Sequence, residues 1–237
     1  MPYFYGFDET YLFLVLPCII LSLWASVNVK STFRRYSSQM SARRITGAAA
    51  AEMVLRSHGV YGVRIERLAG ELTDHYDPKS NVIRLSDSVY NSTSTAAIGV
   101  ACHEAGHAVQ YAQSYAPIKL RAAIIPITNI GSRLAMPLIL LGLLLSFGES
   151  VSFFFVYAGS ACFGLSLLFQ LITLPVEFNA SRRAMKSIEQ ANILSEDEQL
   201  GAKKTLRAAA LTYVAATALA LAQLLRLIRI FGRRNND

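Results

Sequence analysis

The chain has 237 residues, of which 53% are hydrophobic and only 16% are charged. Soluble domains usually carry about 25% charged residues, so this composition argues against an ordinary soluble enzyme and predicts several membrane-spanning helices. The net charge is +7, and the basic residues flank apolar runs. We therefore expect a lipid-bilayer partner with anionic headgroups near cationic loops, and no nucleic-acid partner. The three widely spaced cysteines, Cys18, Cys102 and Cys162, predict neither a disulfide framework nor a cysteine-based zinc site.

The first apolar run covers residues 11–27, which is about the minimum length for crossing a bilayer. Asp8 and Glu9 precede it, and five basic residues follow it: Lys30, Arg34, Arg35, Arg43 and Arg44. The positive-inside rule then predicts an N-terminus outside the cell and a cytoplasmic segment after the span. A cleavable signal peptide is the poorer interpretation, because the run lacks a basic start and a small-residue cleavage site.

Residues 44–120 form the first segment that we assign to catalysis. A helix is expected over residues 46–57, ended by His58 and Gly59. Strands are expected over residues 60–68 and 81–85, with a turn at Asp77 before the second. We expect the strand over residues 81–85 to lie beside an active helix and to bind the substrate backbone by strand addition.

The active helix is expected over residues 95–113 and contains the pattern His103-Glu104-Ala105-Gly106-His107. The two histidines are four residues apart, so their imidazoles leave one helix face and can donate two nitrogens to one Zn²⁺. Glu104 is offset by about 100° around the helix, where it can act as general base towards a water on the metal. The alternative is a pair of core or surface histidines at helical spacing.

A membrane hairpin is predicted over residues 124–147 and 151–174, with a tight polar turn at residues 148–150. Pro175 is expected to close the second of these spans and to start a new helix. Two crossings return the chain to the side it left, so Glu177 lies at the membrane edge on the side of His103 and His107. Two imidazoles, one carboxylate and an open fourth position form the ligand set of a hydrolytic zinc site. The alternative role for Glu177 is to stabilise a helix N-terminus.

Residues 176–207 form the second segment assigned to catalysis, with a new helix beginning at Ser195. A fourth span is predicted over residues 208–225. Basic residues flank it on both sides, so charge does not orient it. We expect it to cross and to leave the C-terminus outside, and the alternative is an interfacial or re-entrant helix.

The whole pattern resembles the YugP-like family of membrane neutral zinc metallopeptidases. The resemblance rests on residues 103–107, residues 177–181, the segment over residues 72–78 and the layout of the spans. More distantly, the chain is similar to HtpX-type and CaaX-processing membrane zinc proteases, in which a glutamate of an E-x-x-A-D element is the third ligand. This resemblance implies that Glu177 is a ligand and that Ala180 matches, whereas Ser181 stands where the distant relatives have aspartate.

We therefore predict a mainly α membrane protein with about four transmembrane helices and a small α+β, zincin-like region facing the cytoplasm, within one integral-membrane domain. Its predicted function is hydrolysis of peptide bonds in membrane or membrane-proximal proteins. His75, Asn179, Ser181 and Arg182 are candidates for supporting or substrate contacts, and His75, Tyr213 and Arg182 for an oxyanion donor; for His75 and Asp77 the alternative is turn chemistry. Two other classes stay open: an adaptor with structural zinc, and a transporter, which the scarcity of ionisable residues in the spans disfavours.

Overall fold

The computed structural model describes residues 8–144 and 149–233. The chain divides into two compact units. The first, here called the helical unit, contains residues 1–24, 120–174 and 213–237. The second, here called the α+β unit, contains residues 25–119 and 175–212, and so includes most of both segments that the sequence assigned to catalysis. The four long helices α1, α5, α6 and α7, whose bounds are given below, each contribute residues to both units.

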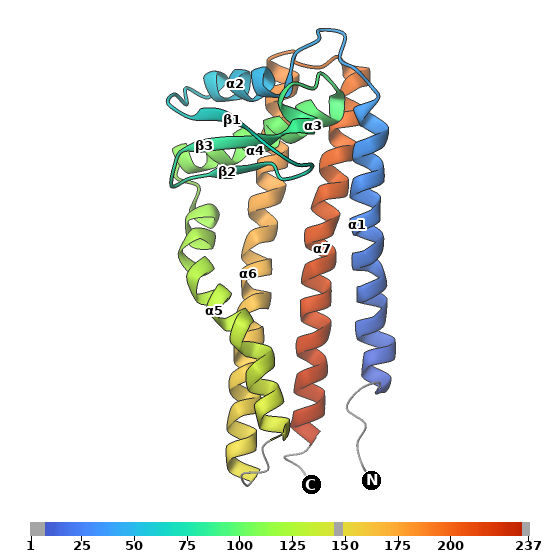
Figure 1. Ribbon diagram of the computed structural model, residues 1–237, viewed down its shortest axis with the longest axis vertical. Coiled ribbons are helices and arrows are strands. Elements are labelled where there is room, and N and C mark those ends of the chain that lie inside the picture. The colour runs from blue at the N-terminus through green and yellow to red at the C-terminus, as the bar shows by residue number, and fades with distance from the viewer. Residues whose placement is uncertain (1–7, 145–148, 234–237) are drawn as a thin grey trace. The chain divides into compact units, whose positions relative to one another are not determined.

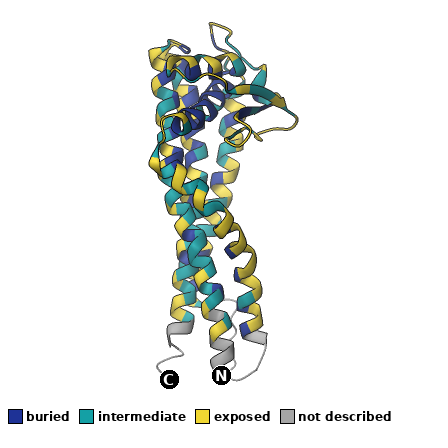
Figure 2. Ribbon diagram, turned by 90° about the vertical axis from the view of Figure 1, so that its left-hand side faces the viewer, coloured by how far each residue is buried: buried dark blue, intermediate teal, exposed yellow. Residues whose placement is uncertain are grey.

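The helical unit is built from parts of four helices that are long and apolar enough to cross a membrane. They are π-helical η1 (Tyr11–Val15) continued by α1 (Leu16–Ser37), then α5 (Ala116–Leu144), α6 (Glu149–Gln190) and α7 (Glu196–Arg233). Most of each apolar stretch is not buried within the chain, as the yellow and teal ribbons of Figure 2 show, which suits helices solvated by lipid. The prediction of four spans is confirmed. The last three residues of the predicted second span, and Gly148 of the predicted turn, lie outside the described residues.

Within the helical unit, α5 and α6 pack closely at two glycines. A Cβ atom on Gly159 would lie 2.8 Å from the Ala135 carbonyl oxygen, and one on Gly131 would lie 3.4 Å from that of Cys162. Small residues let membrane helices approach until their backbones touch, and a hydroxyl pair can add a hydrogen bond across them. Ser132 and Ser166 supply such a pair, with 2.8 Å between their hydroxyl oxygens.

The expectation that Pro175 starts a helix is wrong. α6 continues through Pro175 without interruption as far as Gln190. An interior proline removes one backbone hydrogen bond, but long membrane helices tolerate it because neighbouring groups satisfy the freed carbonyl. Glu177 is therefore carried on the same helix as the preceding apolar stretch.

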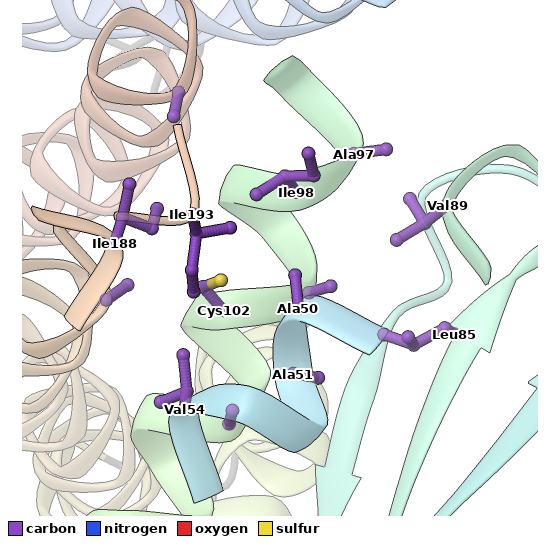
Figure 3. Packing of buried hydrophobic residues seen from close by; sticks show 14 of the residues in the cluster. Ala50, Ala51, Val54, Leu85, Val89, Ala97, Ile98, Cys102, Ile188 and Ile193 are labelled. Carbon is purple, nitrogen blue, oxygen red and sulfur yellow. The ribbon is translucent and has the colours of Figure 1, made fainter. Parts of the chain in front are cut away.

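The α+β unit is centred on two packed helices, α2 (Gly47–Ser57) and α4 (Thr95–Ala112). Each begins at a hydroxyl cap, because the side chains of Thr46 and Ser94 accept a hydrogen bond from the backbone N–H three residues later. α2 ends at His58 as predicted. Figure 3 shows Ile98 and Cys102 of α4 among the core side chains, near Ile193 after α6. Cys102 is fully buried, so it is a packing residue.

A small mixed sheet completes the α+β unit (Figure 1). β1 (Arg64–Leu68), β2 (His75–Asp77) and β3 (Val82–Ser86) are arranged in the order β1-β3-β2, and the short helix α3 (Asp87–Tyr90) follows. β3 pairs parallel with β1 and antiparallel with β2. The expected strand addition at residues 81–85 is therefore wrong, because β3 is the central strand and both of its edges are already paired. The open edges among the described strands belong to β1 and β2.

Candidate metal centre

Helix α4 carries the two histidines in a setting of small side chains. Gly106 faces α6 so closely that a Cβ atom there would lie 2.8 Å from the Ala180 carbonyl oxygen. Gly99 makes a similar approach to α7, because a Cβ atom on Gly99 would lie 3.1 Å from the Ala202 Cα. These contacts let α4 lie against the backbones of both helices. His103 and His107 are then one turn apart on α4, with 4.6 Å between their ring centroids.

Glu177 of α6 lies against both imidazoles. Its Oε2 is 3.2 Å from His103 Nε2 and 3.5 Å from His107 Nε2. Zinc bonds of about 2.0–2.1 Å in tetrahedral geometry place neighbouring ligand atoms about 3.3 Å apart. The separations therefore match the edges of a zinc tetrahedron, and the three side chains could hold a metal ion. Glu177 is only 3% exposed, so its carboxylate is held within the protein at this point.

The field at the site is negative. Burial acts to lower the pKa of His107, but the hydrogen bond that His107 donates to Glu177 and the charge of Glu104 outweigh burial, and the pKa is raised. The same two carboxylates that favour a proton on His107 favour a divalent cation at this position. Glu104 is itself 8% exposed and follows His103 directly on α4, so a carboxylate stands beside the ligand pair.

In each histidine, Nε2 faces Glu177 and the other ring nitrogen, Nδ1, lies against a polar side chain. The Ser181 hydroxyl lies 3.1 Å from His103 Nδ1, and Gln110 Oε1 lies 3.0 Å from His107 Nδ1. Metal-binding histidines depend on such contacts to fix the ring orientation and tautomer. The sequence reasoning named Ser181 and missed Gln110. Its signal was available, because Gln110 follows His107 by three residues and therefore lies on the same helix face.

The remaining candidates on α6 divide into two groups. Asn179 belongs to the network behind the ligands, because its Oδ1 accepts from Gln110 Nε2 at 2.9 Å and from Arg183 Nε at 2.7 Å. Arg182 is exposed, and its neighbour Arg183 makes the contact instead. Tyr213 lies on α7 in the helical unit.

On the sheet side, Asp74 is an acidic residue that the sequence reasoning passed over. Asp74 Oδ1 accepts from the backbone N–H of Ser86 at 2.7 Å. Burial, reinforced by the charge of Glu104, raises the pKa of Asp74 above its ordinary value. His75 is exposed, with Nδ1 2.8 Å from the Thr73 carbonyl. Asp77 bonds to the turn that follows it, which agrees with the alternative of turn chemistry.

Two histidines one turn apart, a buried carboxylate from a second helix and a further glutamate beside them are typical of the class of zinc metallopeptidases, here in a chain with four membrane-spanning helices. The family described as "Putative neutral zinc metallopeptidase" matches residues 11–232, and the chain belongs to this family. It is 44% identical over 228 residues to the "Putative membrane protease YugP" of Bacillus subtilis, with 95% of this chain and 99% of that protein covered. No solved structure matches the chain. The resemblance noted from the sequence is confirmed, as are zinc as the cofactor of the family and the membrane assignment.

Proposed function

We propose that the protein is a membrane endopeptidase that hydrolyses peptide bonds with a water molecule activated at His103, His107 and Glu177. The observation that carries this proposal is the donor set. Three protein ligands leave a fourth tetrahedral position for water or substrate, whereas structural zinc sites have all four positions filled by protein. Zinc held there would act as a Lewis acid, which lowers the pKa of water to about 7 and polarises a carbonyl.

The protein side chains then have distinct tasks. Glu104, which is not among the three ligands, accepts the proton of the attacking water and returns it to the leaving amine. Glu177 and the two imidazoles would hold the cation, since their ligand atoms already lie together as described above. The negative field of Glu104 and Glu177 would favour a cation at this position and disfavour an anionic group of the substrate there.

We further propose that the site faces the cytoplasm and acts on membrane or membrane-proximal proteins. Five basic residues follow the first span within residues 28–44, and two acidic residues precede it. Within the helical unit, Arg226 near the end of α7 donates to Asp8, which precedes η1, at 2.7 Å. An even number of crossings joins these two points, which supports the crossing of α7 and leaves residues 25–119 and 175–212 on one side.

The test of the chemistry is Glu104→Gln in the full chain, purified in detergent. We expect zinc to remain bound at one ion per chain while cleavage of casein falls by about 10²–10⁴-fold, because the proton acceptor is lost and the ligands are kept. Glu52→Gln is the matched control, since Glu52 is an exposed glutamate paired with Arg56 on α2. Full activity of Glu104→Gln with zinc retained would contradict the role of Glu104. Zinc in the wild-type chain without any cleavage would favour an adaptor with structural zinc.

The side of the membrane is tested separately by a single cysteine at Lys79, in the exposed turn between β2 and β3. We expect a membrane-impermeant maleimide to label it in lysed cells and to leave it unlabelled in intact cells. Equal labelling in intact cells would place the site outside and leave the chemistry untouched.

A further inference from the structure

Gln110 is a fully buried amide that no step of the proposed hydrolysis uses. Its Oε1 lies 3.0 Å from His107 Nδ1, and its Nε2 donates to the Val176 carbonyl at 2.8 Å and to Asn179 Oδ1 at 2.9 Å. One side chain of α4 is therefore bonded to a metal ligand and to the turn of α6 that carries Glu177. We propose that Gln110 is a positioning residue that sets the tautomer of His107 and the position of the His107 ring relative to Glu177. This inference rests on the zinc binding of the proposed function.

The orientation of the amide follows from its neighbours. A backbone carbonyl can only accept, so the group that faces Val176 must be the NH₂ of Gln110. Asn179 Oδ1 also receives the Arg183 Nε–H at 2.7 Å, and a guanidinium can only donate, so the oxygen of Asn179 is fixed as an acceptor. Both partners of Gln110 Nε2 are thus acceptors. Turning the amide over would create two contacts between acceptors, and Oε1 is left facing His107.

This orientation decides where the proton of His107 lies. An amide oxygen only accepts, so His107 Nδ1 must carry the hydrogen. A neutral imidazole has one hydrogen, so Nε2 is left with its lone pair, and Nε2 is the nitrogen that lies 3.5 Å from Glu177 Oε2. His103 has no comparable constraint from Ser181, because a hydroxyl can donate or accept. Gln110 therefore prepares His107 to bind zinc before the ion arrives.

The experiment compares Gln110→Met and Gln110→Glu with wild-type full-length protein in detergent. Zinc dissociation constants are measured by competition with a chromogenic chelator, beside the melting temperature of each metal-free protein. Methionine keeps the length of the side chain and removes its hydrogen bonds, so we expect zinc to bind at least about 10-fold more weakly. Glutamate restores an acceptor for His107 Nδ1, so it should bind zinc at least about threefold more tightly than Gln110→Met. Gln113→Met is the control, because Gln113 is the residue that caps the C-terminal end of the same helix, is exposed and also contacts Arg183.

If Gln110 had only a structural role, both variants would lose zinc affinity to the same extent, and the melting temperature of the metal-free protein would fall. A spectroscopic readout separates the two roles. The chain has four histidines, so a ¹⁵N-histidine spectrum of the zinc-loaded protein is simple, and the His107 ring N–H is assigned by its loss in His107→Ala. We expect that ring N–H to be protected from exchange in wild type and in Gln110→Glu, and to exchange freely in Gln110→Met.

Two results would overturn the proposal: Gln110→Met binding zinc within tenfold of wild type, or Gln110→Glu binding no better than Gln110→Met. If Gln110→Met does not fold, the spectrum of Gln110→Glu decides, and an unprotected ring N–H there refutes the role. Absence of zinc binding by the wild-type chain would instead refute the proposed function on which this inference rests.

Discussion

The two compact units of this chain differ in how each is stabilised internally. The α+β unit has a core in which two glycines of α4 lie against neighbouring backbones, and nearly every residue of α4 from Thr95 to Gln110 is buried. The apolar helices of the helical unit expose most of their surface, because lipid solvates them. A substitution in the α+β unit must therefore fit a fixed space, whereas most positions in the helical unit only have to remain apolar.

The largest expected effect is on the metal. Glu177→Gln removes the negative charge that both histidines contact, so we expect zinc to bind more than about 100-fold more weakly, beyond the usual loss for an outer residue. For the wild-type chain, free zinc at 100 times its dissociation constant should stabilise the α+β unit by about 2.7 kcal/mol relative to the metal-free protein. Removing that zinc with a chelator should therefore lower the free energy of unfolding by the same amount.

Hydrogen exchange followed by mass spectrometry locates this effect. Protection should fall in α4 and in residues 175–190 of α6, and should be unchanged in residues 149–174 of the same helix. A uniform loss along α6 would contradict the division into two units with separate sources of stability.

The second prediction compares one substitution in both units. Gly106→Ala places a methyl group 2.8 Å from the Ala180 carbonyl oxygen, so α4 and α6 must separate, at a cost of about 1–3 kcal/mol and with weaker zinc binding. Gly164→Ala of α6 meets nothing within 4 Å, so it should be neutral or stabilise the helix by up to about 1 kcal/mol. Thermal unfolding with and without zinc measures both, and equal effects of the two changes would refute the contrast.

The third prediction concerns pH. Burial and the charge of Glu104 raise the pKa of Asp74, so the folded protein carries an unfavourable ionised carboxyl at pH 7. This penalty is present above the folded pKa and disappears as the pH falls through it towards the ordinary value. Asp74→Asn keeps an acceptor for Ser86 and removes the charge. The metal-free variant should melt higher than wild type at pH 7, with the difference vanishing by about pH 4. A difference that grows on acidification would contradict this assignment.

Much of the architecture could be predicted because it is written in local patterns. Four apolar runs give four membrane helices, and Thr46 with His58 bounds α2 within one residue of the prediction. The order of the strands could not be predicted, because it depends on β2, a three-residue strand with too little alternation to detect. Missing β2 made β3 look like an edge. Pro175 was misjudged because its local preference for helix starts is weaker than the continuity of a long membrane helix.

The candidate site shows the same limit. His103, Glu104 and His107 are recognisable from spacing alone, and Glu177 from counting membrane crossings. The sequence does not distinguish Asp74, whose pKa is raised by burial and by the charge of Glu104, from Asp77, which bonds to the turn that follows it. Ser181 was named with its neighbours in the segment after Glu177, although the more distant proteases have aspartate at this position, and its hydroxyl lies 3.1 Å from His103 Nδ1.

The smallest expected effect lies in the helical unit, at the ion pair of Arg226 with Asp8. The Arg226 side chain is 18% exposed and that of Asp8 is 32% exposed, and the guanidinium also lies 5.0 Å from the centroid of the Tyr11 ring. Partly exposed pairs contribute about 0–1 kcal/mol, so Arg226→Met should lower stability by less than about 1 kcal/mol.

The geometry of that pair is nevertheless a sharp test of how α7 crosses. Asp8→Cys with Arg226→Cys should form a disulfide under mild oxidation in membranes, because the two side chains meet at one end of the helical unit. The matched control is Asp8→Cys with Lys204→Cys, since position 204 lies 22 residues earlier on α7, about 33 Å along the helix axis. Absence of the cross-link between positions 8 and 226 would mean that α7 does not return to the side of Asp8, and the control pair should stay unlinked in either case. The basic end of α7 would then lie in the cytoplasm, where the positive-inside rule favours arginines, and the ion pair of Arg226 with Asp8 would not form.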